Sequence, residues 1–209
     1  MSDFLAIHHV QDPNADTSTP DPHQDTFSKT YLGFWIYLMT DCLLFGTLFA
    51  TYAVLHNSTF GGPSSKELFD LSDAFAETMI LLCSSVTCGL AMLSAIWDKK
   101  SWIIGWLLFT FFLGSSFLFL EIQEFSHFVH EGNDWTKSAF LSSFFTLVGT
   151  HGLHILVGLF WIVVMIGQIL WQGINITTFR RLAIFSLFWH FLDLIWIFIF
   201  TFVYLMGVI

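Results

Sequence analysis

Charged side chains are scarce in this chain of 209 residues. They make up 11% of the sequence, against 55% hydrophobic residues, and the mean hydropathy is +0.70. Because a soluble domain usually carries about 25% charged residues, this composition excludes a globule that faces water on all sides. The seven Lys and Arg residues occur singly or in pairs, which excludes the basic patch of a nucleic-acid-binding protein.

Cysteine is also rare, and none of the three cysteines belongs to a C-x-x-C pair. All three lie in apolar runs, where they are expected to act as small packing residues. Their spacing indicates neither a zinc site nor a disulfide framework. The three residues are Cys42, Cys83 and Cys88.

The beginning of the chain lacks the basic start and apolar core of a cleaved signal peptide. Residues 1–25 are instead polar and hold five of the 16 acidic residues. We predict a mobile polar tail over residues 1–29, in which His8, His9 and His23 are solvated rather than metal-bound.

Long apolar runs are what the sequence does contain. A helix needs about 20 apolar residues to cross a hydrocarbon core of about 30 Å, and five stretches have this length. In lipid each must be a helix, because an open strand would leave its backbone groups unpaired. We therefore predict an all-α integral membrane protein, a bundle of five transmembrane helices in a domain over residues 30–209. The predicted spans cover residues 31–55, 75–97, 102–128, 139–171 and 182–207.

The basic residues predict the orientation of the bundle, since Lys and Arg are enriched on the cytoplasmic side. Lys29, Lys99, Lys100, Arg180 and Arg181 fall on one side of the predicted spans, and Lys66 and Lys137 on the other. The amino terminus should therefore be cytoplasmic and the carboxyl terminus periplasmic.

Ionisable residues inside the spans are the candidate functional groups, because charge is costly in a membrane and usually faces the bundle interior. At 1.5 Å per residue, one set falls at mid-membrane depth and a second toward the outer surface. The first set is Asp41, His151, His154, His190 and Asp193, and the second is Glu77, Glu121, Glu124 and His127.

The spacing within these sets places residues on common helix faces. His151 and His154 are three residues apart, as are His190 and Asp193, and Ile197, Thr201 and Tyr204 continue the second stripe. We expect Glu121 to be held by a polar partner from another helix, either His151 or His154.

Several interpretations of these groups stay open. They could be hydrogen-bond partners that fix the bundle, or His151 or His154 could bind a haem iron together with His190. Asp41, His190, Asp193 and Glu121 could form a proton relay. Metal binding by Glu121 and Glu124 is disfavoured, because a di-metal bundle site needs such motifs on two helices. No redox site of the chain's own is predicted, so we expect no metal and no cofactor bound by it.

Four segments resemble the third subunit of haem–copper terminal oxidases. They are GFWIYLMTDCLLFGTLFATYAVL (residues 33–55), LEIQEF (120–125), VGTHGLHILVG (148–158) and FWHFLDLIWIFIFTFVYLMG (188–207). The T-H-G-L-H and W-H-F-x-D-x-x-W strings, in this order on the last two spans, carry most of the specificity. With its five spans, the chain is most similar to the branch of the family found in bo-type ubiquinol oxidases.

The resemblance implies a supporting subunit, without catalytic residues, of a proton-pumping quinol oxidase that reduces dioxygen to water in the bacterial inner membrane. Haem and copper would belong to subunit I, the direct partner, with subunits II and IV in the same complex. The chain would bind phospholipid and help to sustain proton uptake, and Asp41 matches the family's buried helix carboxylate. The alternatives are subunit III of a cytochrome c oxidase, a membrane cytochrome b and a stand-alone proton transporter.

Overall fold

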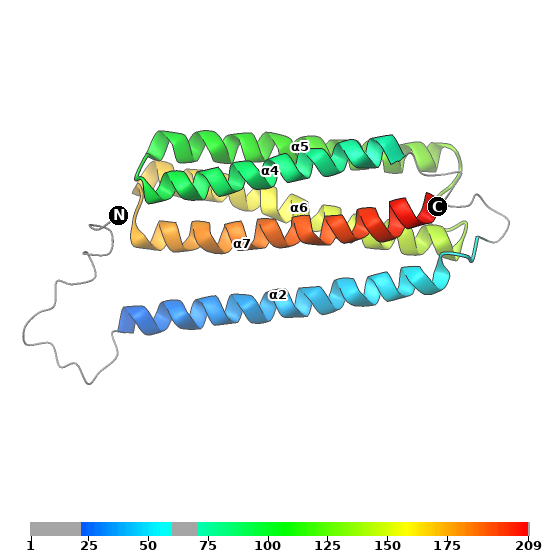
Figure 1. Ribbon diagram of the computed structural model, residues 1–209, viewed down its shortest axis with the longest axis horizontal. Helices are drawn as coiled ribbons and strands as arrows, with labels where there is room; N and C mark the ends of the chain where they lie inside the picture. Colours follow the sequence, from blue (N-terminus) through cyan, green and yellow to red (C-terminus); the bar gives the residue numbers. More distant parts are fainter. Residues whose placement is uncertain (1–21, 60–70, 209) are drawn as a thin grey trace, which may run out of the picture. The chain divides into compact units, whose positions relative to one another are not determined.

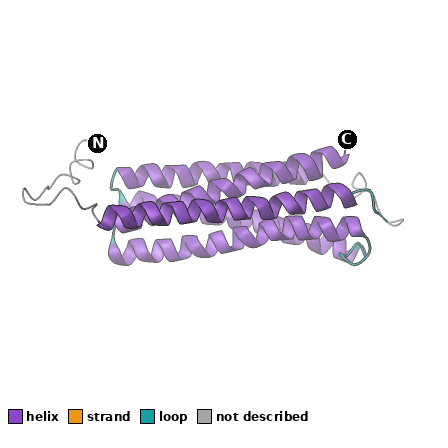
Figure 2. Ribbon diagram, turned by 90° about the horizontal axis from the view of Figure 1, so that it is seen from below, coloured by secondary structure: helices purple, strands orange, loops and turns teal. Residues whose placement is uncertain are grey.

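The computed structural model describes residues 22–59 and 71–208, and these residues form helices and loops without a strand (Figure 2). The helices, labelled in Figure 1, are α2 (Pro22–Leu55), α4 (Leu71–Ile96), α5 (Lys100–His130), α6 (Ala139–Gln172) and α7 (Ile176–Ile199). A π-helical turn, η2 (Phe200–Leu205), and the short α8 (Met206–Val208) continue α7. The predicted tail up to residue 21, with His8 and His9, lies outside the described residues, as do Lys66 and the side chain of His23.

Five helices are long and apolar enough to cross a membrane, which confirms the predicted fold class. Each span is longer than the apolar run that predicted it, when η2 is counted with α7 in the span Ile176–Leu205. Helix α7 begins at Ile176, so Arg180 and Arg181 lie in its first turns, and α2 begins at Pro22. A charge at the membrane surface ends an apolar run without interrupting the backbone hydrogen bonds of a helix.

The chain divides into two units, Met1–Tyr37 and Leu38–Ile209. In the second unit, α4 to α7 form a ring in which each helix contacts two others, because α4 contacts α5 and α7, and α6 contacts α5 and α7. Both views show these four helices alongside one another (Figures 1 and 2). The ring encloses the core that positions the polar groups described below.

Trp189 of α7 lies at the centre of this ring. Its side chain passes so close to Gly114 of α5 and Gly158 of α6 that a Cβ at either glycine would stand 2.9 Å or 2.7 Å from the indole. Its Nε1 donates to Oγ of Ser84 on α4 at 3.0 Å. One fully buried side chain therefore joins all four helices, which the two glycines allow by removing steric bulk.

Trp196 repeats this arrangement two turns further along α7. Its Nε1 donates to Oγ1 of Thr78 on α4 at 3.1 Å, and its ring meets Phe117 of α5 edge-on at 4.6 Å. The π-helical turn then adds a residue to the helical repeat, so Tyr204 is fully buried while Ile197 is 41% exposed. The predicted stripe through Ile197 and Tyr204 is therefore wrong, because the periodicity changes between them.

The part of α2 in the second unit packs on α6 and α7 through aromatic contacts. Phe45 lies against His154 at 5.3 Å and Tyr52 against Phe140 at 6.1 Å. Phe49 meets Phe198 and Phe202 edge-on. These contacts fix the face of α2 that carries Asp41.

Candidate functional site

Asp41 and His154 form a side-chain pair in the middle of the membrane. Oδ1 of Asp41 lies 3.1 Å from Nε2 of His154, and both residues are within two positions of the midpoints of their spans, Lys29–Leu55 and Ala139–Gln172. Asp41 is buried and His154 is half-buried, with side chains 6% and 17% exposed. Both residues are predicted to lie in the mid-membrane layer, and in the structure they meet across the contact between α2 and α6.

The hydrogen bonds of the His154 ring determine how many protons the pair holds. Nδ1 lies 2.7 Å from the carbonyl oxygen of Thr150, and because a carbonyl only accepts, Nδ1 must carry a proton. One further proton then lies between Nε2 and Asp41, either on the ring or on the carboxyl group. The pair has no net charge in both cases, which is the arrangement that a low-dielectric environment tolerates.

His151, one turn before His154, has a different environment. Its side chain is completely buried, and its ring lies 5.2 Å from that of Trp196 and 5.9 Å from that of Phe117. Within the described residues, neither ring nitrogen has a hydrogen-bond partner. The aromatic rings leave no space for a porphyrin against His151, so haem ligation by this residue does not fit the packing.

Glu121 of α5 packs its carboxyl group directly on the backbone of α6. A Cβ at Gly152 would stand 2.5 Å from Oε1 and 2.7 Å from Oε2 of Glu121. The expected pairing of Glu121 with His151 or His154 is wrong: His154 bonds Asp41 instead, and in the described part of the chain Oε2 of Glu121 has no partner. The close approach is possible because position 152 has no side chain.

Two further glutamates lie near Glu121, as the outer layer predicts. Glu77 of α4 and Glu124 of α5 are close enough to interact with it electrostatically. Tyr204 donates its hydroxyl proton to Oε2 of Glu124 at 2.9 Å, whereas Oε2 of the buried Glu77 has no partner among the described residues. His127 does not join them; its side chain is 68% exposed, and its Nε2 lies 3.3 Å from Oε1 of Glu131, the residue that follows α5.

His190 and Asp193 point to different surroundings although they are three residues apart. Asp193 is 6% exposed and faces α4, where Cys88 lies within electrostatic range. His190 is exposed, and its Nδ1 lies 2.6 Å from the carbonyl oxygen of Ser186. Residues three apart on a helix are rotated by about 60° from one another, which is enough to bury one and expose the other.

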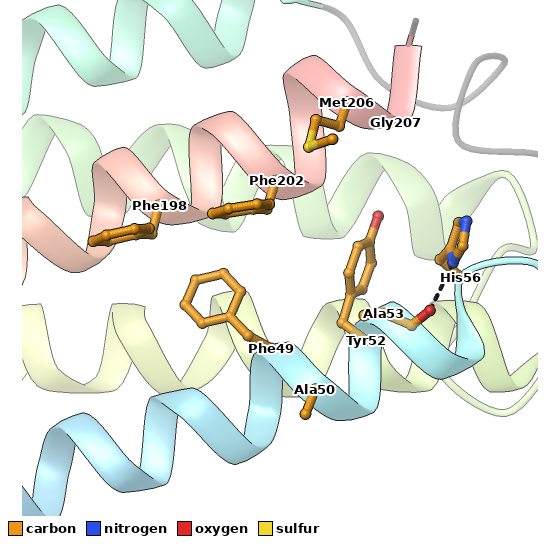
Figure 3. A pocket seen from close by; sticks show the side chains of 9 residues that line it. All are labelled: Phe49, Ala50, Tyr52, Ala53, His56, Phe198, Phe202, Met206 and Gly207. Carbon is orange, nitrogen blue, oxygen red and sulfur yellow. Dashed lines mark hydrogen bonds between the residues drawn. The ribbon is translucent and has the colours of Figure 1, made fainter.

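A groove lies between the second half of α2 and the end of α7. Its volume is about 580 Å³, and its lining is almost entirely apolar. Figure 3 shows Phe49, Phe198 and Phe202 around it, with His56 at the end beyond α2. Asp41 does not line this groove. The lining residues are Phe49, Ala50, Tyr52, Ala53, His56, Phe198, Phe202, Met206 and Gly207.

Sequence reasoning missed the groups that hold these side chains in place. Thr78 and Ser84 accept the indole N–H groups, and the Tyr204 hydroxyl was not connected with Glu124. Trp and small hydroxyl residues repeated along facing helices were the available signal, because a buried indole N–H needs an acceptor. In the described part of the chain, no three His, Cys, Asp or Glu side chains are grouped closely enough for a metal ion.

The sequence of the chain is similar to those of known proteins. The family model of cytochrome c oxidase subunit III matches residues 6–208. The chain is 51% identical over 207 residues to cytochrome bo(3) ubiquinol oxidase subunit 3 of Pseudomonas aeruginosa, which covers 99% of both chains. It is 44% identical over 202 residues to quinol oxidase subunit 3 of Bacillus subtilis, which covers 96% of this chain and 98% of the relative. It is 45% identical over 183 residues to cytochrome c oxidase subunit 3 of Bacillus sp. strain PS3, which covers 86% of each chain.

Proposed function

The chain belongs to the cytochrome c oxidase subunit III family, and from this membership we propose that it is the third subunit of a bacterial ubiquinol oxidase. In this proposal it is a non-redox component of a proton-pumping complex that reduces dioxygen to water. The observation that carries the proposal is the 51% identity over nearly the full length to a bo(3) ubiquinol oxidase subunit 3. Haem and copper would be held by subunit I, its direct partner, with subunits II and IV in the same complex.

Purification of the complex tests this proposal. The chain, tagged and extracted in mild detergent, should bring down a larger polypeptide with a Soret band and quinol-dependent oxygen consumption. Its neighbouring subunit II should lack the cysteine pair that binds copper, and an intact pair would favour a cytochrome c oxidase. A chain that purifies alone with its own haem would be a membrane cytochrome b, and proton flux by the pure chain in liposomes would indicate a transporter.

We also propose that the groove between α2 and α7 binds a phospholipid. Its apolar walls match an acyl chain, and Tyr52 and His56 offer polar groups near the end of α2 (Figure 3). Ala53→Trp would fill the groove, whereas Val54→Trp places the same indole on a position that is 78% exposed. Lipid extracted from the purified complex should fall by about one molecule per chain with the first variant only.

The Asp41 and His154 pair is the group that we propose to support proton uptake. It sits at mid-membrane depth and contains a proton that can move between a carboxyl group and a ring nitrogen. The buried pair does not line the groove, so its influence on subunit I would be indirect. The cytoplasmic amino terminus and periplasmic carboxyl terminus stay part of the proposal, and reporter fusions at both ends would test them.

A further inference from the structure

The side chain of His190 has a hydrogen-bonding group that the hydrocarbon chains of lipid cannot satisfy. It stands at the midpoint of the 30-residue span Ile176–Leu205, so each end of the span is about 21 Å or more away. Half the thickness of the hydrocarbon core is only about 15 Å, which places lipid headgroups and bulk water beyond the reach of an imidazole. Yet the side chain is exposed on the surface of the described helices.

The hydrogen bond within α7 determines what the exposed side of the ring can do. Nδ1 lies 2.6 Å from the carbonyl oxygen of Ser186 and must be protonated, because that oxygen can only accept. In the neutral ring, Nε2 is therefore an acceptor, and it has no hydrogen bond to another described residue. An unsatisfied polar atom in hydrocarbon is costly.

Exposed hydroxyl groups elsewhere in the spans avoid this cost. Thr47, Thr51 and Thr201 each donate to a carbonyl oxygen three or four residues earlier in the same helix. A hydroxyl bonded in this way can face lipid. His190 satisfies only one of its two nitrogens by the same means, and the second points away from its own helix.

We propose that His190 is a docking point for a transmembrane helix of a neighbouring oxidase subunit, which offers an O–H or N–H donor to Nε2 at mid-membrane depth. The inference rests on the proposed function, since it requires a complex. Leu194 and Ile197 follow His190 on the same face and are 51% and 41% exposed. They provide the apolar surface on which such a helix would pack, with the single polar contact fixing its register.

Photo-cross-linking in the intact complex tests the location of this helix. A benzophenone amino acid at position 190 should cross-link the chain to a second subunit. The same probe at Phe112, which is 63% exposed near the middle of α5, provides a comparison at similar depth. An adduct with lipid or quinone alone, or a cross-link within the chain, would overturn the inference.

Two substitutions test the polar contact itself. His190→Phe removes the acceptor, whereas His190→Gln keeps one. Retention of the partner subunit after dilution in detergent should fall about three- to tenfold for His190→Phe, as expected for one interhelical hydrogen bond, and less for His190→Gln. Equal retention of the two variants and the wild type would refute the contact. A wild-type chain that purifies without any partner overturns both proposals, but an intact complex without a cross-link at position 190 overturns this one alone.

Discussion

The carboxyl group of Glu121 occupies the place that a side chain at position 152 would need. A Cβ there would stand 2.5 Å from Oε1 of Glu121, so α5 and α6 can approach only because residue 152 is glycine. The contact joins α5, which carries Glu121 and Glu124, to α6, which carries His151 and His154. The packing of α5 on α6 therefore depends on the missing side chain at position 152 as well as on the carboxyl group of Glu121.

Gly152→Ala should therefore destabilise the protein. The added methyl group overlaps a buried carboxyl group, and overpacking of this kind typically costs about 1–3 kcal/mol. Gly149→Ala is the matched control, because its Cβ would meet only Phe125, at an ordinary 3.6 Å. Thermal unfolding in detergent should show a lower Tm for the first variant alone. Adding Glu121→Ala to Gly152→Ala should recover part of the loss, and strict additivity of the two changes would contradict the contact.

The hydrogen bond from Trp189 to Ser84 gives a second prediction. Ser84→Ala leaves the indole N–H without its acceptor at a fully buried site, which should cost about 1–2 kcal/mol. Ser116→Ala removes a hydroxyl whose one hydrogen bond to a described residue is to the Phe112 carbonyl oxygen of its own helix, so it should leave stability unchanged. The comparison is made by thermal unfolding of the two purified variants.

Trp196 and Thr78 offer a check on that result. Their bond repeats the same chemistry one layer further along α7, so Thr78→Val should resemble Ser84→Ala. If neither variant lowers the Tm, the indole groups do not depend on these acceptors.

The sequence predicts the five helices but not how they face one another. Helix existence follows from local apolar length, and the depth of Asp41, Glu121 and His154 follows from counting residues. The contacts between side chains of different helices depend on how each helix is rotated about its axis and on which helices lie beside it. Local sequence patterns do not encode either property. Asp41 thus meets His154 rather than leaving it for Glu121, because α2 packs Phe45 against the same face of α6.

The end of α7 shows a second limit of sequence periodicity. The π-helical turn over Phe200–Leu205 adds a residue to the repeat, so Tyr204 reaches Glu124 although a regular helix would place it on the stripe of Ile197. A repeat of 3.6 residues does not anticipate this insertion. The contact itself is testable.

Tyr204→Phe should destabilise the end of the bundle at which α7 continues into η2. The variant removes the donor to Oε2 of Glu124, in a region where Glu77 and Glu121 already lie nearby. Loss of one buried hydrogen bond to a carboxyl group should cost about 1–3 kcal/mol. Hydrogen exchange of the last turns of α7 should report the change, with faster exchange than in wild type. Tyr52→Phe removes a hydroxyl near the groove and provides a tyrosine control; equal effects of both would argue against a specific role of the bond to Glu124.

Substitution of Asp41 by asparagine tests whether the proton of the carboxyl group matters, because asparagine keeps the shape of the side chain but cannot ionise. In Asp41→Asn the amide N–H can donate to Nε2 of a neutral His154 ring, whose Nδ1 still donates to the Thr150 carbonyl oxygen. The hydrogen bond survives, but the pair loses the proton that could move between its members. If this proton supports uptake by subunit I, the variant complex should assemble normally, start with wild-type oxygen consumption and lose activity during prolonged turnover.

Asp41→Ala provides the structural comparison, because it leaves Nε2 of the half-buried His154 without its partner. We expect lower yields of assembled complex from this variant, since an unpaired polar atom in the membrane costs free energy. Thr47→Val on the same helix changes an exposed hydroxyl whose one bond within the described part of the chain is to the Leu44 carbonyl oxygen, so it should keep both yield and activity. Oxygen consumption and proton pumping are followed over many turnovers for each complex. If Asp41→Asn keeps full activity and pumping throughout while Asp41→Ala fails to assemble, Asp41 holds α2 to α6 and has no part in proton uptake.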